Sequence, residues 1–96
     1  MKVIWSKAAV NRLSEHLKWV AEDSLLQAER VEEGILKEIE ELSLHPERYP
    51  VDRFKINNHG DFRAFEKFSL RVSYQISGDR ILILRIRHVK QEPKSY

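Results

Sequence analysis

The apolar positions of the chain change their spacing near residue 60. Before that point they recur every three or four residues, first at Val10, Leu13, Leu17, Val20 and Ala21, then at Ala28, Val31, Ile35, Ile39 and Leu42. This spacing places each set on one face of a helix. The sequence therefore predicts two amphipathic helices that are joined without a real loop and form a helical hairpin. Trp5 and Trp19 are expected to pack in the core and between the helices.

Capping residues mark where both helices begin. A short apolar strand is predicted at residues 2–5, and it ends at Ser6, a suitable N-cap for a helix that starts at Lys7. Ser24 stands before the second apolar set, and Gln27 three residues later completes a capping box. The two helices are thus expected to follow each other directly.

The second predicted helix has a glycine in its middle and prolines beyond its end. Gly34 costs roughly 1 kcal/mol relative to alanine, which predicts that a neighbouring segment packs closely on that turn. Pro46 disfavours helical backbone at the residue before it, so we expect the helix to end around Leu44. Residues 46–61 then form a connector that finishes in an Asn-Asn-His-Gly turn.

After the connector the spacing becomes strand-like. Residues 62–67, 70–76 and 80–88 are three runs rich in β-branched and aromatic residues, and Gly78 begins a two-residue hairpin turn between the last two. Pro93 is expected to stop the last strand. The whole chain is therefore predicted to be one α+β domain, in which an N-terminal strand and a helical hairpin pack on one face of a C-terminal antiparallel β-meander.

Strict alternation along these strands divides their side chains between two faces. The face toward the helices is expected to hold Leu70, Val72, Tyr74, Ile76, Leu82, Leu84, Ile86 and His88. The open face is expected to hold the cations Arg63, Lys67, Arg71, Arg85 and Arg87 above a floor of Phe65, Ile81 and Ile83. Five cations on adjacent strands repel one another, which predicts an anion-binding surface. For any single one of them, an ordinary solvated side chain whose stem covers apolar surface remains the alternative.

The charge of the chain is divided between its halves. Residues 1–50 carry seven Lys or Arg against ten Asp or Glu, a net charge of −3, whereas residues 51–96 carry ten against five, a net charge of +5. The second half therefore predicts a basic surface for an anionic partner. No apolar run approaches the ~20 residues of a membrane span, and we expect a cytoplasmic protein that has no membrane contact.

Metal and cofactor motifs are not found. The four histidines lack metal-ligand spacing, the chain has no cysteine, and the three glycines stand apart rather than in a phosphate-binding loop. We therefore expect neither a metal nor a small-molecule cofactor.

Several segments together resemble the RelE/ParE superfamily of bacterial type II toxins, often labelled plasmid stabilisation proteins. The runs are FRAFEKFSLRVSYQISGDRILILRIRH and HVKQEPKSY, and they follow the order of strand, helical hairpin and meander over nearly the whole chain. The resemblance implies a toxin that a cognate antitoxin protein from the same operon holds inactive. RelE-like members are RNases that cut messenger RNA inside the ribosome, and ParE-like members block DNA gyrase.

RNA cleavage without a metal requires a base for the 2′-hydroxyl, cations for the phosphate and an acid for the leaving oxygen. Carried over from the RelE-like pattern, Arg63 and Arg71 would be phosphate clamps, and Tyr96 would stack on a base or transfer a proton. His88 is a candidate general acid or base, and Arg87 joins this catalytic set. Lys67, Arg85, Lys90 and Lys94 are the candidate residues for binding RNA or another target.

Other features of the sequence favour the ParE-like alternative. A second strand cation of the RelE pattern falls beside Phe65, and the arginine expected in the tail falls near Gln91, with Lys90 as the nearest substitute. The long paired helices and the ILRIRH strand look closer to ParE. His88 is as well explained by a structural role at the strand end, and Tyr96 by a frayed terminus. The cations and Tyr96 slightly favour a metal-independent endoribonuclease, with gyrase inhibition as the alternative.

Overall fold

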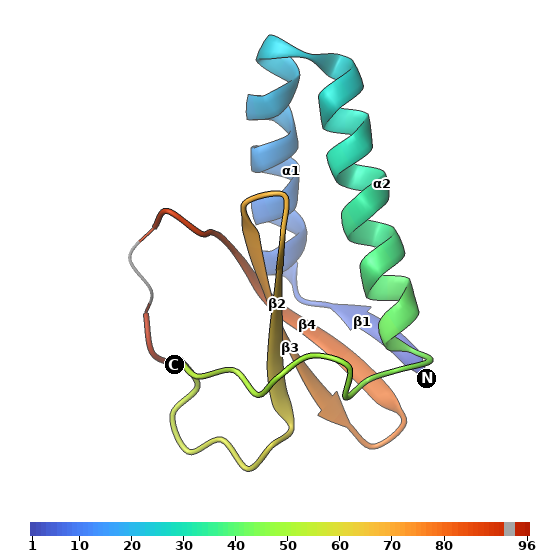
Figure 1. The fold of residues 1–96 in the computed structure, drawn as a ribbon, viewed down its shortest axis with the longest axis vertical. Coiled ribbons are helices and arrows are strands. Elements are labelled where there is room, and N and C mark those ends of the chain that lie inside the picture. The colour runs from blue at the N-terminus through green and yellow to red at the C-terminus, as the bar shows by residue number, and fades with distance from the viewer. Residues whose placement is uncertain (92–93) are drawn as a thin grey trace.

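The computed structural model describes residues 1–91 and 94–96, and Pro93 lies outside these residues. The elements are β1 (Lys2–Trp5), α1 (Lys7–Asp23), α2 (Leu25–Leu42), β2 (Phe62–Lys67), β3 (Leu70–Ser77) and β4 (Arg80–His88). The strands form one sheet in the order β1-β4-β3-β2, where β1 is parallel to β4 and the other pairs are antiparallel. The two helices lie side by side and rise from the sheet (Figure 1). The predicted α+β architecture is confirmed.

The predicted caps hold both helices at their starts. The Ser6 hydroxyl accepts the N–H of Ala9 at 3.0 Å, and the Ser24 hydroxyl accepts the N–H of Gln27 at 3.1 Å. Ser6 also donates to the carbonyl of Leu84 at 2.7 Å, so one side chain ties the start of α1 to β4.

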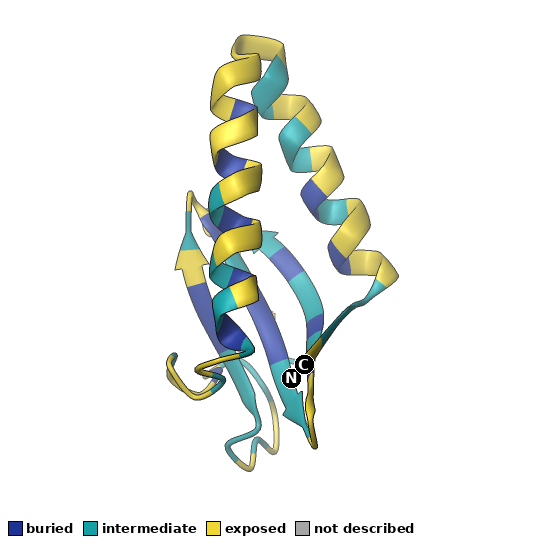
Figure 2. Cartoon of the chain, turned by 90° about the vertical axis from the view of Figure 1, so that its right-hand side faces the viewer, coloured by how far each residue is buried: buried dark blue, intermediate teal, exposed yellow. Residues whose placement is uncertain are grey.

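The core lies between the helices and the sheet, as the buried bands in Figure 2 show. All five members of the second apolar set are buried on α2, whereas α1 buries Ala9 and Leu13 and leaves Val10 exposed. Trp19 is 62% exposed and lies against the ring of His16, so its predicted place in helix packing is wrong. The far part of the hairpin extends beyond the sheet (Figure 2).

A β-bulge in β4 reverses the expected alternation of side chains. Ser73 lies opposite Arg85, but the next residue, Tyr74, lies opposite Ile83. Leu84 is therefore an extra residue in β4, and its carbonyl is the one that Ser6 satisfies. Every side chain of β4 before the bulge is thus moved to the other face of the sheet.

The bulge corrects the predicted core of the last strand. Ile81 and Ile83, expected on the open face, are fully buried in the core together with Ile86. Leu82 and Leu84, expected against the helices, are only half-buried and take no part in that core. The sequence of the strand is apolar on both parities here, so alternation alone could not reveal the bulge.

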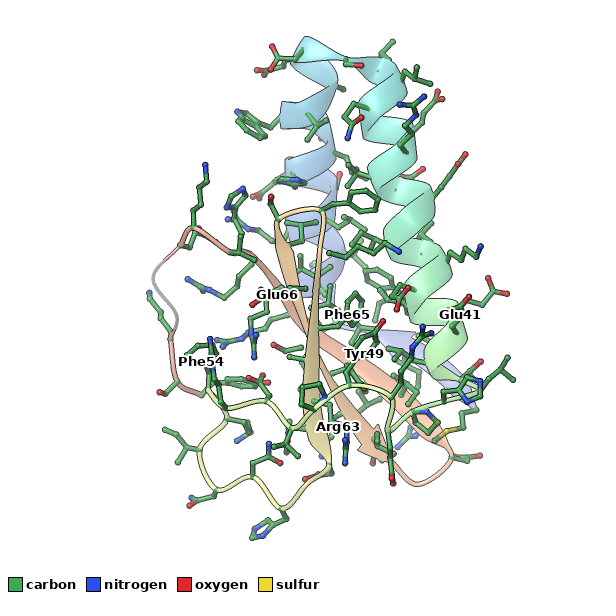
Figure 3. All side chains as sticks on the ribbon, in the orientation of Figure 1. Glu41, Tyr49, Phe54, Arg63, Phe65 and Glu66 are labelled. Atoms are coloured by element: carbon green, nitrogen blue, oxygen red, sulfur yellow. The ribbon has the colours of Figure 1, made fainter. Side chains whose placement is uncertain are left out.

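The first strand of the meander also faces the other way. Phe65 pairs with Val72, a core residue, and stacks on the ring of Tyr49 with 5.0 Å between the ring centroids. Figure 3 shows Phe65 on the side of Tyr49 and Glu66 on the opposite side. Because alternate residues share a face, Arg63 and Lys67 lie on the helix side with Phe65, and their predicted place on the open face is wrong.

The turn between β2 and β3 packs on the glycine of α2. A Cβ atom at Gly34 would lie 2.2 Å from an edge atom of the Phe68 ring, which confirms the predicted close neighbour. The turn therefore anchors the far end of the meander to the hairpin.

Replacing Ser69 with glycine is expected to stabilise the protein by about 0.5–1 kcal/mol. Phe68 and Ser69 have φ of 52° and 63°, a left-handed conformation that costs residues with a Cβ atom. Thermal unfolding measures the change. Gly78, with φ of 60° in the neighbouring hairpin, supplies the opposite control, because Gly78→Ala should lower the unfolding temperature. An unchanged or lower stability in Ser69→Gly would contradict the assigned turn.

Candidate functional site

The connector between α2 and β2 carries an aspartate into the interior. Val51 forms a bridge with Arg63, and the N–H of Asp52 donates to the carbonyl of Phe62 at 2.8 Å. The Asn58 amide donates to the carbonyls of Asp52 and Phe62 and fixes the loop that follows. Asp52 is only 1% exposed. A buried carboxylate requires several hydrogen-bond donors, and the residues that supply them to Asp52 identify the candidate site.

The Asp52 carboxylate accepts hydrogen bonds from Arg71, Tyr96 and a main-chain N–H. An Arg71 Nη atom donates to Oδ1 at 2.8 Å, and the main-chain N–H of Phe54 donates to the same oxygen at 3.1 Å. The Tyr96 hydroxyl donates to Oδ2 at 2.6 Å. We call Asp52, Arg71, Tyr96 and Arg85, whose guanidinium lies 3.9 Å from the centroid of the Tyr96 ring, the Asp52 cluster.

The cluster shifts the titration of its two acidic groups in opposite directions. Burial alone would raise the pKa of Asp52, but the hydrogen bonds from Tyr96, Arg71 and the Phe54 N–H outweigh it and hold the pKa below its ordinary value. Burial, and then the hydrogen bond to Asp52, raise the pKa of Tyr96 to about 12. The tyrosine is therefore held as a neutral donor and the aspartate as an anion.

These shifts predict a stability profile that falls at both ends of the pH range. The lowered pKa of Asp52 stabilises the fold above the ordinary carboxyl pKa, and this contribution is lost as the pH falls through the folded-state value. The raised pKa of Tyr96 stabilises the fold below pH ~10, and the contribution is lost between pH ~10 and ~12. Urea unfolding across pH measures both limbs. Tyr96→Phe should weaken the alkaline loss, and an identical alkaline limb in that variant would contradict the assignment.

Tyr96 is tied down by the main chain as well as by its hydroxyl. Its N–H donates to the carbonyl of Phe54 at 3.0 Å, and its main-chain oxygen accepts the N–H of Ile56 at 2.6 Å. The Lys55 ammonium donates to the same oxygen at 3.2 Å and lies 5.3 Å from the Tyr96 ring centroid. The frayed terminus that the sequence allowed is not what the structure shows, because Tyr96 folds back over the sheet.

Arg71 is surrounded by acidic and aromatic groups. Besides Asp52, it donates to a carboxylate oxygen of Glu66 at 3.0 Å, and the ring centroid of Phe54 lies 4.8 Å from its guanidinium carbon. Two carboxylates thus compensate one guanidinium. The predicted crowding of cations required an anion to neutralise it, and at Arg71 the chain itself supplies that anion.

Arg63 and Lys67 lie on the other side of the sheet and do not join the cluster. Arg63 donates to the carbonyls of Tyr49 at 2.7 Å and Glu47 at 3.3 Å, and so holds the connector. Lys67 forms an ion pair of 3.4 Å with Glu38 of α2. The physical reason is the register of β2, which turns both cations toward the helices.

His88 and Lys90 lie at the end of β4, on the side of α1. The rings of His88 and His16 are 5.8 Å apart, and Nδ1 of His88 accepts the main-chain N–H of Lys90 at 3.1 Å. Burial first, and then the nearby His88 and Arg12, lower the pKa of His16. His88 thus follows the parity of Ile86, apart from Tyr96.

Several grooves open at the surface of the described residues, and two of them differ sharply in composition. The first, the cationic groove, has a volume of about 440 Å³ and is lined by Arg12, Arg85, Arg87 and Lys94 with Ala8, Ile86 and Gln91. The second, the hairpin groove, has a volume of about 670 Å³ and runs between α1 and α2; its apolar lining residues are Trp5, Val10, Leu13, Leu17, Ala21, Leu25, Ala28 and Leu36. Arg87 and Lys94 of the predicted set therefore lie in the cationic groove.

The central residue of the cluster, Asp52, is absent from the sequence prediction. It stands in an irregular connector, where no periodicity indicates its direction. The sequence carried an indirect signal, since the predicted crowding of cations required an anion to neutralise it, which was assigned to a binding partner and not to a residue of the chain.

Among the residues that the structure describes, neither α1 nor α2 has the stretch of apolar residues that a bilayer span requires. Within residues 1–91 and 94–96, no three His, Cys, Asp or Glu side chains come together in a way that could hold a metal ion.

Comparisons with known proteins give the chain its family. A solved structure titled "Chromosomal ParDE TA system from P. aeruginosa" is similar with a TM-score of 0.71, covering 92% of this chain and 95% of that chain at 18% sequence identity, which shows the shared fold. No curated protein sequence matches the chain. The family model described as "ParE toxin of type II toxin-antitoxin system, parDE" matches residues 3–93. The resemblance to the RelE/ParE superfamily is confirmed, and the chain belongs to the ParE toxin family of type II toxin-antitoxin systems.

Proposed function

We propose that the chain stops growth by binding DNA gyrase and that it does not cut RNA. Membership of the ParE family favours this function over the RNase function that the sequence slightly favoured. The observation that carries the proposal is the Asp52 cluster, because it engages the groups that RNA cleavage would need.

The cluster is poorly suited to RNA cleavage for three physical reasons. The Tyr96 hydroxyl already donates to Asp52, and its pKa of about 12 makes it a weak proton donor near neutral pH. Arg71 is compensated by two carboxylates, so little of its charge is left for a pentacoordinate phosphate. The third reason is that Arg63, a predicted phosphate clamp, lies on the face of the sheet opposite the Asp52 cluster.

We also propose that the hairpin groove takes the cognate antitoxin. Membership of a toxin-antitoxin family supports a cognate antitoxin as the partner. The groove leaves Val10, Leu25 and Leu36 at 49%, 72% and 45% exposure, and exposed apolar residues in one patch mark a surface that a partner covers. A cognate antitoxin holds a toxin of this kind inactive by staying bound to it, so the antitoxin is the proposed occupant of the groove.

Expression of the chain without antitoxin in a bacterial host tests the proposed function. Plasmid DNA isolated shortly after induction should have lost negative supercoils, while messenger RNA should show no new 5′ ends inside coding regions. Cleaved messages with normally supercoiled plasmid would overturn the proposal and favour the endoribonuclease. An antitoxin co-expressed from the same plasmid serves as the control, because it should restore both growth and supercoiling.

A further inference from the structure

The hairpin groove carries charges of opposite sign on its two sides. Lys18 lies in its lining on α1, and Glu29 and Glu32 lie in its lining on α2. All three side chains are exposed, and within the described part of the chain none of them forms an ion pair. Glu41, near the end of α2, instead pairs with Arg48 at 2.8 Å. The charges beside the groove are therefore uncompensated in the free chain.

The two carboxylates lie on the same helical face as the apolar lining of α2. Glu29 and Glu32 are spaced at intervals of three and four residues from Leu25 and Leu36, and all four line the groove. A partner that covers the leucines therefore lies against both carboxylates and removes part of their water. Covering a carboxylate without supplying a cation costs free energy. The partner is thus required to bring positive charge to the α2 side.

The walls of the groove favour a helix as the occupant. Both walls are α-helices, which pair their main-chain N–H and C=O groups internally and offer none to an extended segment. A helix satisfies its own main chain and presents an apolar stripe to such a groove. The lining on α1 runs from Val10 to Ala21, which is about 17 Å at the rise of an α-helix. Roughly three turns of a partner helix therefore fit.

We propose that the hairpin groove selects an amphipathic antitoxin helix that carries lysines or arginines on its flank toward Glu29 and Glu32. The inference rests on the antitoxin docking proposed above and adds the charge pattern by which this chain distinguishes its cognate antitoxin. A helix with acidic residues on that flank would bring like charges together along the apolar contact and is rejected. On the other flank, an acidic residue is the match for Lys18.

Calorimetric titration of the purified chain with its purified cognate antitoxin tests the charge pattern. Glu29→Lys, Glu32→Lys is expected to weaken binding by about 100-fold at low salt, because each reversal replaces an attraction by a repulsion. Salt of about 0.5 M should reduce this loss to about tenfold, because it screens charges at the edge of an interface. Glu33→Lys, Glu40→Lys makes the same change at exposed positions of α2 outside the groove and should leave affinity within about threefold.

A charge swap identifies the cations of the partner and makes the result decisive. An antitoxin in which those cations are replaced with glutamate should bind Glu29→Lys, Glu32→Lys more tightly than it binds the parent chain. Unchanged affinity after the reversal, or equal losses in both double variants, would overturn the charge pattern. If Leu36→Glu weakens antitoxin binding and the reversal does not, the groove remains the docking site and this inference alone fails. If neither change alters the affinity, the proposed docking in the groove fails as well.

Discussion

Replacing Asp52 with alanine is expected to lower the free energy of unfolding by about 3 kcal/mol. Its side chain has no exposure, and its removal leaves the guanidinium of Arg71, which is 16% exposed, without its closest partner. It also removes the acceptor of the Tyr96 hydroxyl and of the Phe54 N–H. For a domain of this size the change corresponds to a fall in Tm of more than about 10 °C, which calorimetry measures.

Glu66 provides the matched control for this prediction. It pairs with the same arginine at 3.0 Å, but its side chain is 52% exposed. A solvent-exposed pair contributes at most about 1 kcal/mol, so Glu66→Ala should shift Tm far less than Asp52→Ala. Equal shifts in the two variants would mean that the Asp52 cluster does not hold the connector and tail as described.

Replacing Leu36 with glutamate is expected to weaken antitoxin binding by about 100-fold, or about 2.8 kcal/mol. Leu36 lines the hairpin groove and is 45% exposed, so a charge at this position remains solvated in the free toxin. In the complex the same charge would be buried against an apolar partner without a compensating group. Titration of the antitoxin by calorimetry gives the two affinities, and growth arrest should persist in the variant.

Leu44→Glu is the control for the groove. Leu44 is 75% exposed and lies beyond the end of α2, outside the hairpin groove. The same change of charge there should leave antitoxin affinity within about threefold, since rim and non-contact positions contribute little. If Leu36→Glu binds the antitoxin as tightly as the parent chain, the antitoxin occupies another surface.

The elements of the fold could be predicted because their signals are local. Ser6 and Ser24 cap the helices at the expected places, and the apolar set of α2 is buried in full. The three strands of the meander begin where the sequence places them. These features depend on side chains a few residues apart, which periodicity and capping chemistry describe directly.

The faces of the sheet could not be predicted, because they depend on non-local pairing. One extra residue, Leu84, moves Ile81 and Ile83 to the core, and the register of β2 moves Arg63 and Lys67 away from the open face. A shift of one residue is enough for this, since side chains alternate with a period of two.

For the site, too, residues marked by a local pattern could be predicted, and residues placed by distant contacts could not. Arg71 and Arg85 share the open face, as the alternation of the strands predicted, whereas the sequence left the position of Tyr96 open and only the structure brings it to Asp52. Asp52 arrives from a connector whose course is set by pairing with β2, and no local pattern marks it. The anion that compensates Arg71 is therefore a residue that only the tertiary structure identifies.

Supercoiling of relaxed plasmid by purified gyrase and ATP, with the purified chain added, tests the proposal that this ParE-family chain acts on gyrase. We expect supercoiling to stop as the chain approaches the concentration of gyrase, and prior addition of antitoxin to restore it. Tyr96→Phe, assayed at a temperature where it is folded, should inhibit as the parent does, because the hydroxyl is assigned a structural role. Undiminished supercoiling in the presence of excess folded chain would contradict the proposed action on gyrase.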